Sequence, residues 1–346
     1  MKRWTGPAFA GLLLFGLPMG YMAAEGVHDA AAVQDMDAAR AAFRRPATIP
    51  FPDDNPYSKA KAHLGKMLFF DPLLSGSRKH SCSSCHVPAK SWGDGRAHAV
   101  GEDPRGMDIR TPTLIDVAFV DILGWDGKFP DLESVAFVPL TSPQNMNMTE
   151  RELVRRLRAV PRYRAAFVKA FGDKRITRRR IELALATYER LIVAGTAPFD
   201  RWVMGDDDAI SPEAKRGFAL FNGKAHCASC HSGPSFTDGS FQDIGSATGS
   251  DVGRGRLFPA SEKLQYAFKT PTLRDVAERG PYMHDGSIAT LQGVIELYNQ
   301  GGIDRPSRSP SIKPLGLIAA EKAELVAFLK TLSAPAIEAQ SPNLAK

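Results

Sequence analysis

The sequence predicts an all-α fold built from two related domains with long loops. Apolar residues recur at helical spacing in several segments, whereas few segments alternate as strands do. With 30 Gly and 25 Pro among 346 residues, we expect many turns and loops between the helices. Short motifs of the first half recur in the same order in the second half, which indicates an internal duplication. The content of 43% hydrophobic and 24% charged residues suits a chain that buries a core.

The N-terminus has the pattern of a secretory signal peptide. Lys2 and Arg3 precede an apolar stretch with small residues at its end, so we expect residues 1–24 to be removed and the mature protein to be periplasmic. An uncleaved membrane anchor is the alternative, but Pro18 interrupts the stretch before it reaches the roughly 20 apolar residues that span a bilayer. No other segment is apolar enough, so we expect no stable membrane insertion after cleavage.

Three segments follow the predicted signal peptide. Residues 25–56 are expected to form an Ala-rich helix over 27–45 and then an extended, Pro-rich lead-in. Residues 57–196 and 197–346 are expected to form the first and second domains. Helical periodicity predicts helices from Thr149 to Val160, from Ile181 to Leu191, from Leu291 to Tyr298 and from Ala319 to Leu332.

A Cys-x-x-Cys-His motif occurs in each predicted domain, as Cys82-Ser-Ser-Cys85-His86 and as Cys227-Ala-Ser-Cys230-His231. This is the attachment signature of c-type haem, in which two thiols bind the porphyrin and the His becomes an axial iron ligand. A dithiol redox motif would need a βαβ context, which is missing. A zinc site would have to bridge two pairs far apart in the chain. We therefore predict two covalently bound c-type haems.

The sequence resembles the bacterial dihaem cytochrome c peroxidase family, and within it the MauG-like branch. The likeness rests on both haem motifs, the repeated Thr-Pro-Thr-Leu, the Gly-Trp-Asp-Gly-Lys run at 124–128 and the Pro-Tyr-Met-His-Asp-Gly-Ser run at 281–287. It implies two cytochrome c-like haem domains related by duplication. It also implies that the first haem reacts with peroxide, that the second passes electrons, and that Trp125 relays them between the two.

The resemblance implies a modified pocket on the open side of the first haem. Pro139 matches the proline of the family's distal pocket, and Asn145 stands where the family has a Glu. An amide can orient peroxide by hydrogen bonds but cannot shuttle a proton. Glu102 and Glu133 are candidates for the missing acid. In the family, a distal His that can bind the first iron stands near the position of Glu102. Since that His is missing here, we expect the first iron to have an open face. His98 lies a few residues earlier and is more simply explained as a solvated loop residue.

The resemblance implies an axial Tyr for the second haem and a possible calcium ion. Tyr298 occupies the place of the distal ligand, as in the MauG-like branch, and a phenolate favours oxidised iron. Met283 and Met204 are the alternatives. For calcium, the carbonyls of Arg279 and Pro281 match the family's donors, and Thr111 stands in place of an Asn.

The stretch between the two motifs is strongly basic. Exposed helix faces with paired acids explain this most simply, and a docking surface for an acidic redox partner is the sharper alternative. Export argues against nucleic acid. The basic residues are Arg151, Arg155, Arg156, Arg158, Arg162, Arg164, Lys169, Lys174, Arg175, Arg178, Arg179 and Arg180.

Together these features predict a periplasmic dihaem oxidoreductase. We expect hydrogen peroxide, or oxygen plus electrons, to oxidise a protein partner, and the branch points to maturation of the tryptophan-derived quinone in a methylamine dehydrogenase precursor. One alternative is an ordinary cytochrome c peroxidase with a small cytochrome or cupredoxin as electron donor. The other is a non-catalytic dihaem electron carrier.

Overall fold

The computed structural model describes residues 1–2 and 36–344, so the predicted signal peptide and most of the predicted 27–45 helix lie outside the described residues. Residues 36–41 are helical. The chain divides into two compact units, Met1–Ala39 and Arg40–Lys346, and everything that follows concerns the second. Among the described residues, no helix is both long and apolar enough to cross a membrane.

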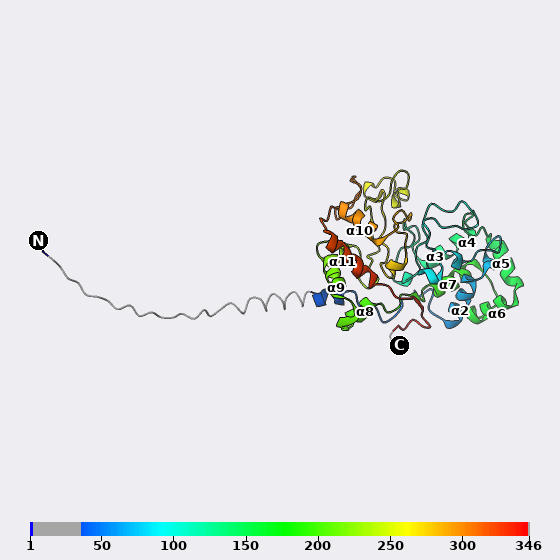
Figure 1. Cartoon of the computed structure of the whole chain (residues 1–346). Helices are drawn as coiled ribbons and strands as arrows, with labels where there is room; N and C mark the ends of the chain where they lie inside the picture. Colours follow the sequence, from blue (N-terminus) through cyan, green and yellow to red (C-terminus); the bar gives the residue numbers. More distant parts are fainter. Residues whose placement is uncertain (3–35, 345–346) are drawn as a thin grey trace. The chain divides into compact units, whose positions relative to one another are not determined.

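The second unit is rich in helix and has little sheet, as predicted (Figure 1). Its α-helices are α2 (Lys59–Phe69), α3 (Leu132–Ala136), α4 (Val138–Thr141), α5 (Glu150–Ala159), α6 (Pro161–Phe171), α7 (Arg178–Glu189), α8 (Pro198–Val203), α9 (Pro212–Asn222), α10 (Leu291–Gln300) and α11 (Ala319–Lys330). The strands are β1 (Ile192–Val193), β2 (Phe241–Gln242), β3 (Phe268–Lys269) and β4 (Ile337–Glu338). They pair antiparallel as β1 with β4 and β2 with β3.

Short 3-10 helices punctuate the long connections between these elements. They are η1 (Pro72–Leu74), η2 (Cys82–Ser84), η3 (Pro88–Lys90), η4 (Val117–Phe119), η5 (Asp207–Ala209), η6 (Cys227–Ser229), η7 (Arg254–Arg256), η8 (Glu262–Leu264) and η9 (Val276–Glu278). Two of them, η2 and η6, contain the Cys pairs.

The predicted helices begin and end at recognisable capping residues. The Thr149 side chain accepts a hydrogen bond from the Glu152 N–H and so caps α5, as its position in the sequence predicts. Helix α10 ends at Gly301, whose left-handed backbone conformation (φ 83°) suits a residue without a Cβ. The predicted 181–191 and 319–332 helices correspond to α7 and α11, with shifts of up to three residues at their ends.

Two helix pairs form the frame of the unit, and a glycine lies at each crossing. Helix α2 packs on α7, and α9 packs on α11. A Cβ on Gly65 would lie 1.9 Å from the carbonyl oxygen of Ala184, and a Cβ on Gly217 would lie 2.0 Å from that of Glu324. Each crossing therefore requires glycine, because any side chain would collide with backbone.

Each frame carries its own apolar packing next to a haem motif. Leu64, Leu68 and Trp92 belong to a buried core against which Cys82 packs. In the other frame, buried aromatic rings contact one another, mostly edge to face or tilted and in one pair stacked. These rings belong to Phe43, Phe199, Phe218, Phe221, Phe236 and Phe328. Both motifs therefore lie against rigid packing rather than on free loops.

Candidate functional site

The histidines of the two Cys-x-x-Cys-His motifs are held in the same way. His86 and His231 each donate their backbone N–H to the carbonyl of the first Cys in their motif, at 2.9 Å in both cases. The His86 Nδ1 lies 3.2 Å from the carbonyl oxygen of Trp92, and the His231 Nδ1 lies 2.9 Å from that of Phe236. An imidazole that donates from Nδ1 keeps a lone pair on Nε2, as an iron ligand requires. Burial lowers the pKa of both imidazoles, which keeps them neutral.

The second motif opens onto a largely apolar cavity that fits a haem. Cys227, Cys230 and His231 line it together. Much of the remaining wall is apolar and comes from α10, α11 and the Thr-Pro-Thr-Leu segment, including Leu273, Leu291, Val294, Ile295, Leu325 and Leu329. Burial raises the pKa of the Cys227 thiol to about 12, so it is not a ready thiolate ligand for a metal ion. Two thiols and an imidazole on one apolar wall are the groups that c-type attachment needs.

Of the candidate second axial ligands, Tyr298 and Met283 line this cavity, whereas Met204 does not. Met204 is 65% exposed on the surface. Burial chiefly raises the pKa of the Tyr298 phenol, and Cys227 and Cys230 act in the same direction.

The first motif is linked to the segment predicted to face its haem. The Cys85 Sγ lies 3.8 Å from the carbonyl oxygen of Val100. Two residues further on, the Glu102 N–H donates to the Asn145 carbonyl oxygen at 2.7 Å. Pro139 accepts from the Met146 N–H at 3.2 Å, which closes the turn that carries Asn145. The Asn145 Oδ1 is buried and has no hydrogen-bond partner in the described part of the chain, so it is free to receive one.

The acidic candidates near the first site differ in their partners. The Glu102 carboxylate accepts from the Ser77 backbone N–H and hydroxyl at 3.0 and 2.7 Å, and these bonds lower its pKa even though its partial burial acts to raise it. Glu133 forms a buried ion pair with Arg190 at 2.6 and 2.8 Å and also accepts from Asn55. The Glu133 carboxylate is thus occupied by Arg190 and Asn55, which does not favour it as the proton donor. His98 is exposed, as its reading as a loop residue predicts.

Trp125 lies where the two halves meet. Its side chain is 9% exposed and lines the cavity of the second motif. The indole Nε1 donates to the Arg110 carbonyl oxygen at 2.9 Å, and the Trp125 carbonyl accepts from the Lys269 N–H at 2.8 Å. The side chain of Trp125 is therefore bonded to the residue before the first Thr-Pro-Thr-Leu, and its backbone is bonded to the residue before the second.

Two of the three residues expected to bind calcium already have protein partners. The Thr111 hydroxyl donates to Asp94 at 3.1 Å. The Arg279 carbonyl oxygen accepts from the Arg110 guanidinium. Within the described residues, no group of three or more His, Cys, Asp or Glu side chains is placed to hold a metal ion, so the Cys pairs are not assembled into one zinc site.

Sequence reasoning missed a buried carboxyl beside the first motif. Glu189, at the end of α7, is 7% exposed, and its side chain has no hydrogen bond or ion pair among the described residues. Burial chiefly raises the pKa of the Cys82 thiol, and a charge on Glu189 would raise it further. Burial raises the pKa of Glu189 itself to about 8, so it is largely neutral at pH 7. The helical pattern places this residue on a buried face, but nothing in it marks the carboxyl as unpaired.

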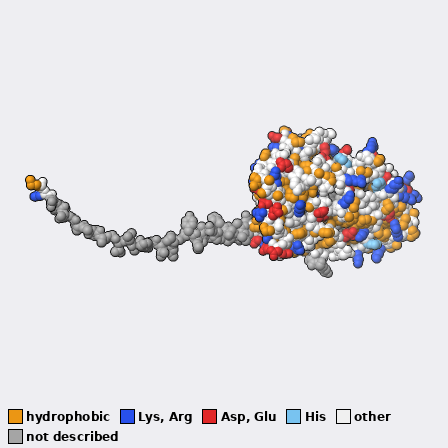
Figure 2. Space-filling view, viewed as in Figure 1, with side chains coloured by type: hydrophobic (Ala, Val, Ile, Leu, Met, Phe, Trp, Pro, Cys, Tyr) orange, Lys and Arg blue, Asp and Glu red, His pale blue; other side chains and the backbone are white. Residues whose placement is uncertain are grey.

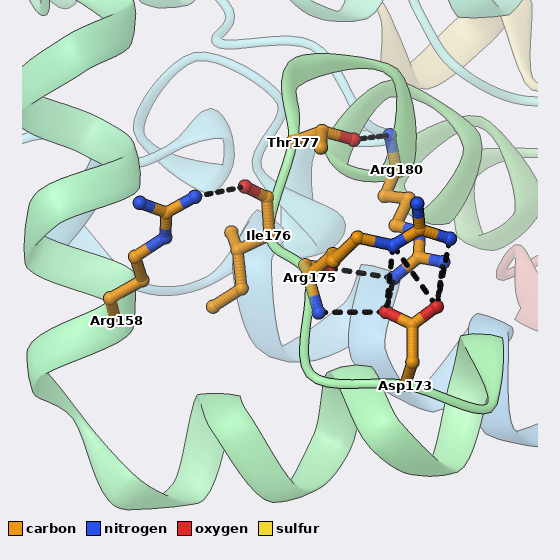
Figure 3. A network of polar contacts seen from close by, with 6 residues as sticks. All are labelled: Arg158, Asp173, Arg175, Ile176, Thr177 and Arg180. Carbon is orange, nitrogen blue, oxygen red and sulfur yellow. Dashed lines mark hydrogen bonds and ion pairs between the residues drawn. The ribbon is translucent and has the colours of Figure 1, made fainter.

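The basic stretch spans α5, α6 and the start of α7, where blue side chains gather in Figure 2. Many of its arginines are paired, as the simpler interpretation predicts. Asp173 binds both Arg175 and Arg180, and Arg158 donates to the Ile176 carbonyl (Figure 3). Residues 149–182 still carry twelve basic and four acidic side chains, a net charge of +8, whereas the whole chain has +6. The rest of the chain is therefore slightly acidic.

Comparison with known proteins places the chain in one family. Residues 59–208 match the family model for di-haem cytochrome c peroxidase, and residues 214–333 match that for cytochrome c. The chain is 48% identical to the methylamine utilization protein MauG of Methylorubrum extorquens, over 91% of this chain and 90% of that protein. It is 45% identical to MauG of Methylophilus methylotrophus, over 88% and 92%.

A solved structure supports the same placement. The crystal structure of a MauG-like protein associated with microbial copper homeostasis has a TM-score of 0.79 and 29% identity, and the match covers 87% of this chain and 97% of that one. With the two haem-attachment motifs, these similarities settle the class of the protein. The chain belongs to the MauG-like branch of the dihaem cytochrome c peroxidase family, and it is an oxidoreductase with two c-type haems.

Proposed function

We propose that this oxidoreductase uses hydrogen peroxide at its first haem to oxidise a protein partner, and that the partner is a methylamine dehydrogenase precursor whose tryptophan-derived quinone it completes. The observation that carries the proposal is Tyr298, which shares a cavity with Cys227, Cys230 and His231. An oxygen ligand of this kind favours oxidised iron, which suits an enzyme that must hold oxidising equivalents until a partner binds. The two MauG relatives bear the name of methylamine utilization.

The first haem would be attached at Cys82 and Cys85 and held by His86, with its other face open. The bound haem would supply the redox chemistry, and the residues of the chain would hold the haem and orient the peroxide. The unpartnered Asn145 amide orients peroxide, and the Glu102 backbone holds Asn145 in place. Each peroxide takes up two electrons and two protons to give two waters. Asn145 cannot deliver those protons, so they come from solvent. Glu102, whose pKa is lowered by its hydrogen bonds from Ser77, could pass a proton on only after taking it up from solvent.

The second haem would be held by His231 and Tyr298. Trp125 couples the two haems, because its indole is bonded to the first Thr-Pro-Thr-Leu segment while its ring lines the second cavity. Electrons from the partner would then reach the first site without direct contact between partner and peroxide. The basic stretch supplies a positive surface for an acidic partner.

The proposal extends to the localisation of the protein, its domain boundaries and its calcium site. We infer a periplasmic protein that loses residues 1–24, has a lead-in over 25–56, and has domains at 57–196 and 197–346 that arose by duplication and keep long loops. The matching glycines at the two helix crossings and the matching histidine bonds support the duplication. A calcium ion at Thr111, Arg279 and Pro281 stays a prediction.

The test is incubation of the holoprotein with peroxide and a methylamine dehydrogenase precursor. We expect the absorbance of the completed quinone to grow with added peroxide. Rapid peroxide consumption with a reduced small cytochrome or cupredoxin, without quinone formation, would identify an ordinary peroxidase instead. Failure to react with peroxide at all would identify an electron carrier.

A further inference from the structure

Two buried guanidinium groups lie on the wall of the second cavity. Arg110 comes from the first half of the chain and Arg279 from the second, and each is 7% exposed. Arg110 donates to the Arg279 carbonyl oxygen, and Arg279 donates to the Thr272 carbonyl oxygen at 2.5 Å. The two cationic side chains are thus fixed next to each other at the junction of the halves.

Neither guanidinium has a carboxylate partner among the described residues. The Nε atoms of Arg110 and Arg279 are both buried and have no hydrogen-bond acceptor. Asp94 and Asp275 act on them only at a distance, since neither carboxylate bonds to either guanidinium. The other buried arginines of the described chain are neutralised, in the pairs Arg190–Glu133 and Arg274–Asp200.

This arrangement is unfavourable unless an anion completes it. An uncompensated buried charge costs several kcal/mol. Here two like charges lie together, and burial and the neighbouring Arg110 lower the pKa of Arg279 to about 10. Buried donors without acceptors in a native protein call for a missing partner. The missing partner has to be negatively charged, has to accept from Nε–H groups, and has to reach them from the cavity.

We infer that Arg110 and Arg279 bind the propionate carboxylates of the haem attached at Cys227 and Cys230. This haem brings two carboxylates into the same cavity, and guanidinium groups bind carboxylates through paired hydrogen bonds. The inference rests on haem attachment at the second motif. It does not depend on which partner protein is oxidised.

The inference gives Arg110 a further role as a positioning residue. Its carbonyl accepts from the Trp125 indole, while its guanidinium lies on the cavity wall. One residue would then connect a propionate of the second haem to the Trp125 ring. A propionate held in this way orders the region through which the two haems are coupled.

The test replaces each arginine in the holoprotein and measures the midpoint potential of each haem by spectroelectrochemistry. We expect Arg110→Gln and Arg279→Gln to keep two haems, by pyridine haemochrome assay, and to lower the potential of the second haem, because the ferrous form loses a buried cation. Arg110→Lys keeps the positive charge and should therefore shift the potential of the second haem less than Arg110→Gln does. Arg216→Gln, which removes an exposed arginine of α9 that does not line the cavity, should leave both potentials unchanged.

Unchanged potentials in both Gln variants, with two haems retained, would overturn the inference. A shift confined to the first haem would assign the propionate to that haem and overturn it too. If the variants fail to fold, infrared difference spectra of wild-type protein with labelled haem propionates serve instead. We expect no protonated propionate band between about pH 5 and pH 8; such a band would contradict a site with two cationic partners.

Discussion

The two haem motifs share one scaffold and face different surroundings. In each half a helix crossing closed by glycine, a 3-10 helix at the Cys pair and an Nδ1-to-carbonyl bond fix the axial His. The first motif contacts Val100 through Cys85, and the nearby Glu102 N–H bonds to Asn145, whose side-chain oxygen has no partner among the described residues. The second motif faces Tyr298 across an apolar cavity. The comparison indicates that the two halves hold their histidines in the same way and differ in the side chains around them, and we expect any difference in reactivity to come from those side chains.

The largest expected effect concerns the far wall of the second site. Tyr298→Phe removes the phenol oxygen and should abolish the low-spin ferric signal of the second haem. Oxidation of the protein partner should fall by about 100-fold or more, because loss of a metal-site group has effects of this size or larger. Electron paramagnetic resonance and partner turnover check both. Tyr282→Phe is the control, since Tyr282 lines the same cavity but bonds to the Val276 carbonyl. A preserved low-spin signal in Tyr298→Phe would point to Met283.

The next effect concerns the first site. Asn145→Glu places a carboxyl where the amide is, and a general acid at this point should speed the reaction with peroxide by about 100-fold or more. Asn145→Gln, an amide of the same length as Glu, should not. Stopped-flow absorbance after mixing with peroxide measures both rates. Equal rates for the two variants would show that proton delivery at this position does not limit the reaction.

The shared frame gives a third prediction. Gly65→Ala and Gly217→Ala should each destabilise the holoprotein by about 3 kcal/mol, because the new Cβ meets a backbone carbonyl that cannot turn away. Thermal or denaturant unfolding measures this. Gly93→Ala is the control, since the nearest atom to its Cβ would be 3.7 Å away. If only one of the two helix glycines proves sensitive, the frames are not equivalent.

The smallest expected effect is on the pH dependence of stability, and it comes from Glu189 in the first half of the chain. Glu189 has a pKa of about 8 when folded and an ordinary value near 4.5 when unfolded. Between these values the folded state binds more protons, so the free energy of unfolding should fall as pH rises, by up to about 1.4 kcal/mol per pH unit. Glu189→Gln should flatten this slope between about pH 5 and pH 8. Denaturant titrations at several pH values measure it, and parallel slopes for wild type and variant would contradict a buried, unpaired Glu189.

Much of the frame could be predicted from local sequence. The cap at Thr149, the glycine after α10 and the Cys-x-x-Cys-His motifs act over a few residues, so their signals are local. The pairing of Glu133 with Arg190 could not be predicted, because it joins two helices 57 positions apart in the chain. In the sequence, Arg110 is the residue before the first Thr-Pro-Thr-Leu, and Arg279 is a candidate calcium donor through its carbonyl. That they meet without a carboxylate is a property of the packed cavity.

Electron paramagnetic resonance of the ferric holoprotein tests the difference between the two halves most directly. One high-spin signal and one low-spin signal, in equal amounts, are predicted, the first from an iron with an open face above His86 and the second from an iron held by His231 and Tyr298. Two low-spin signals would contradict an accessible first iron and with it the peroxide chemistry proposed for this chain.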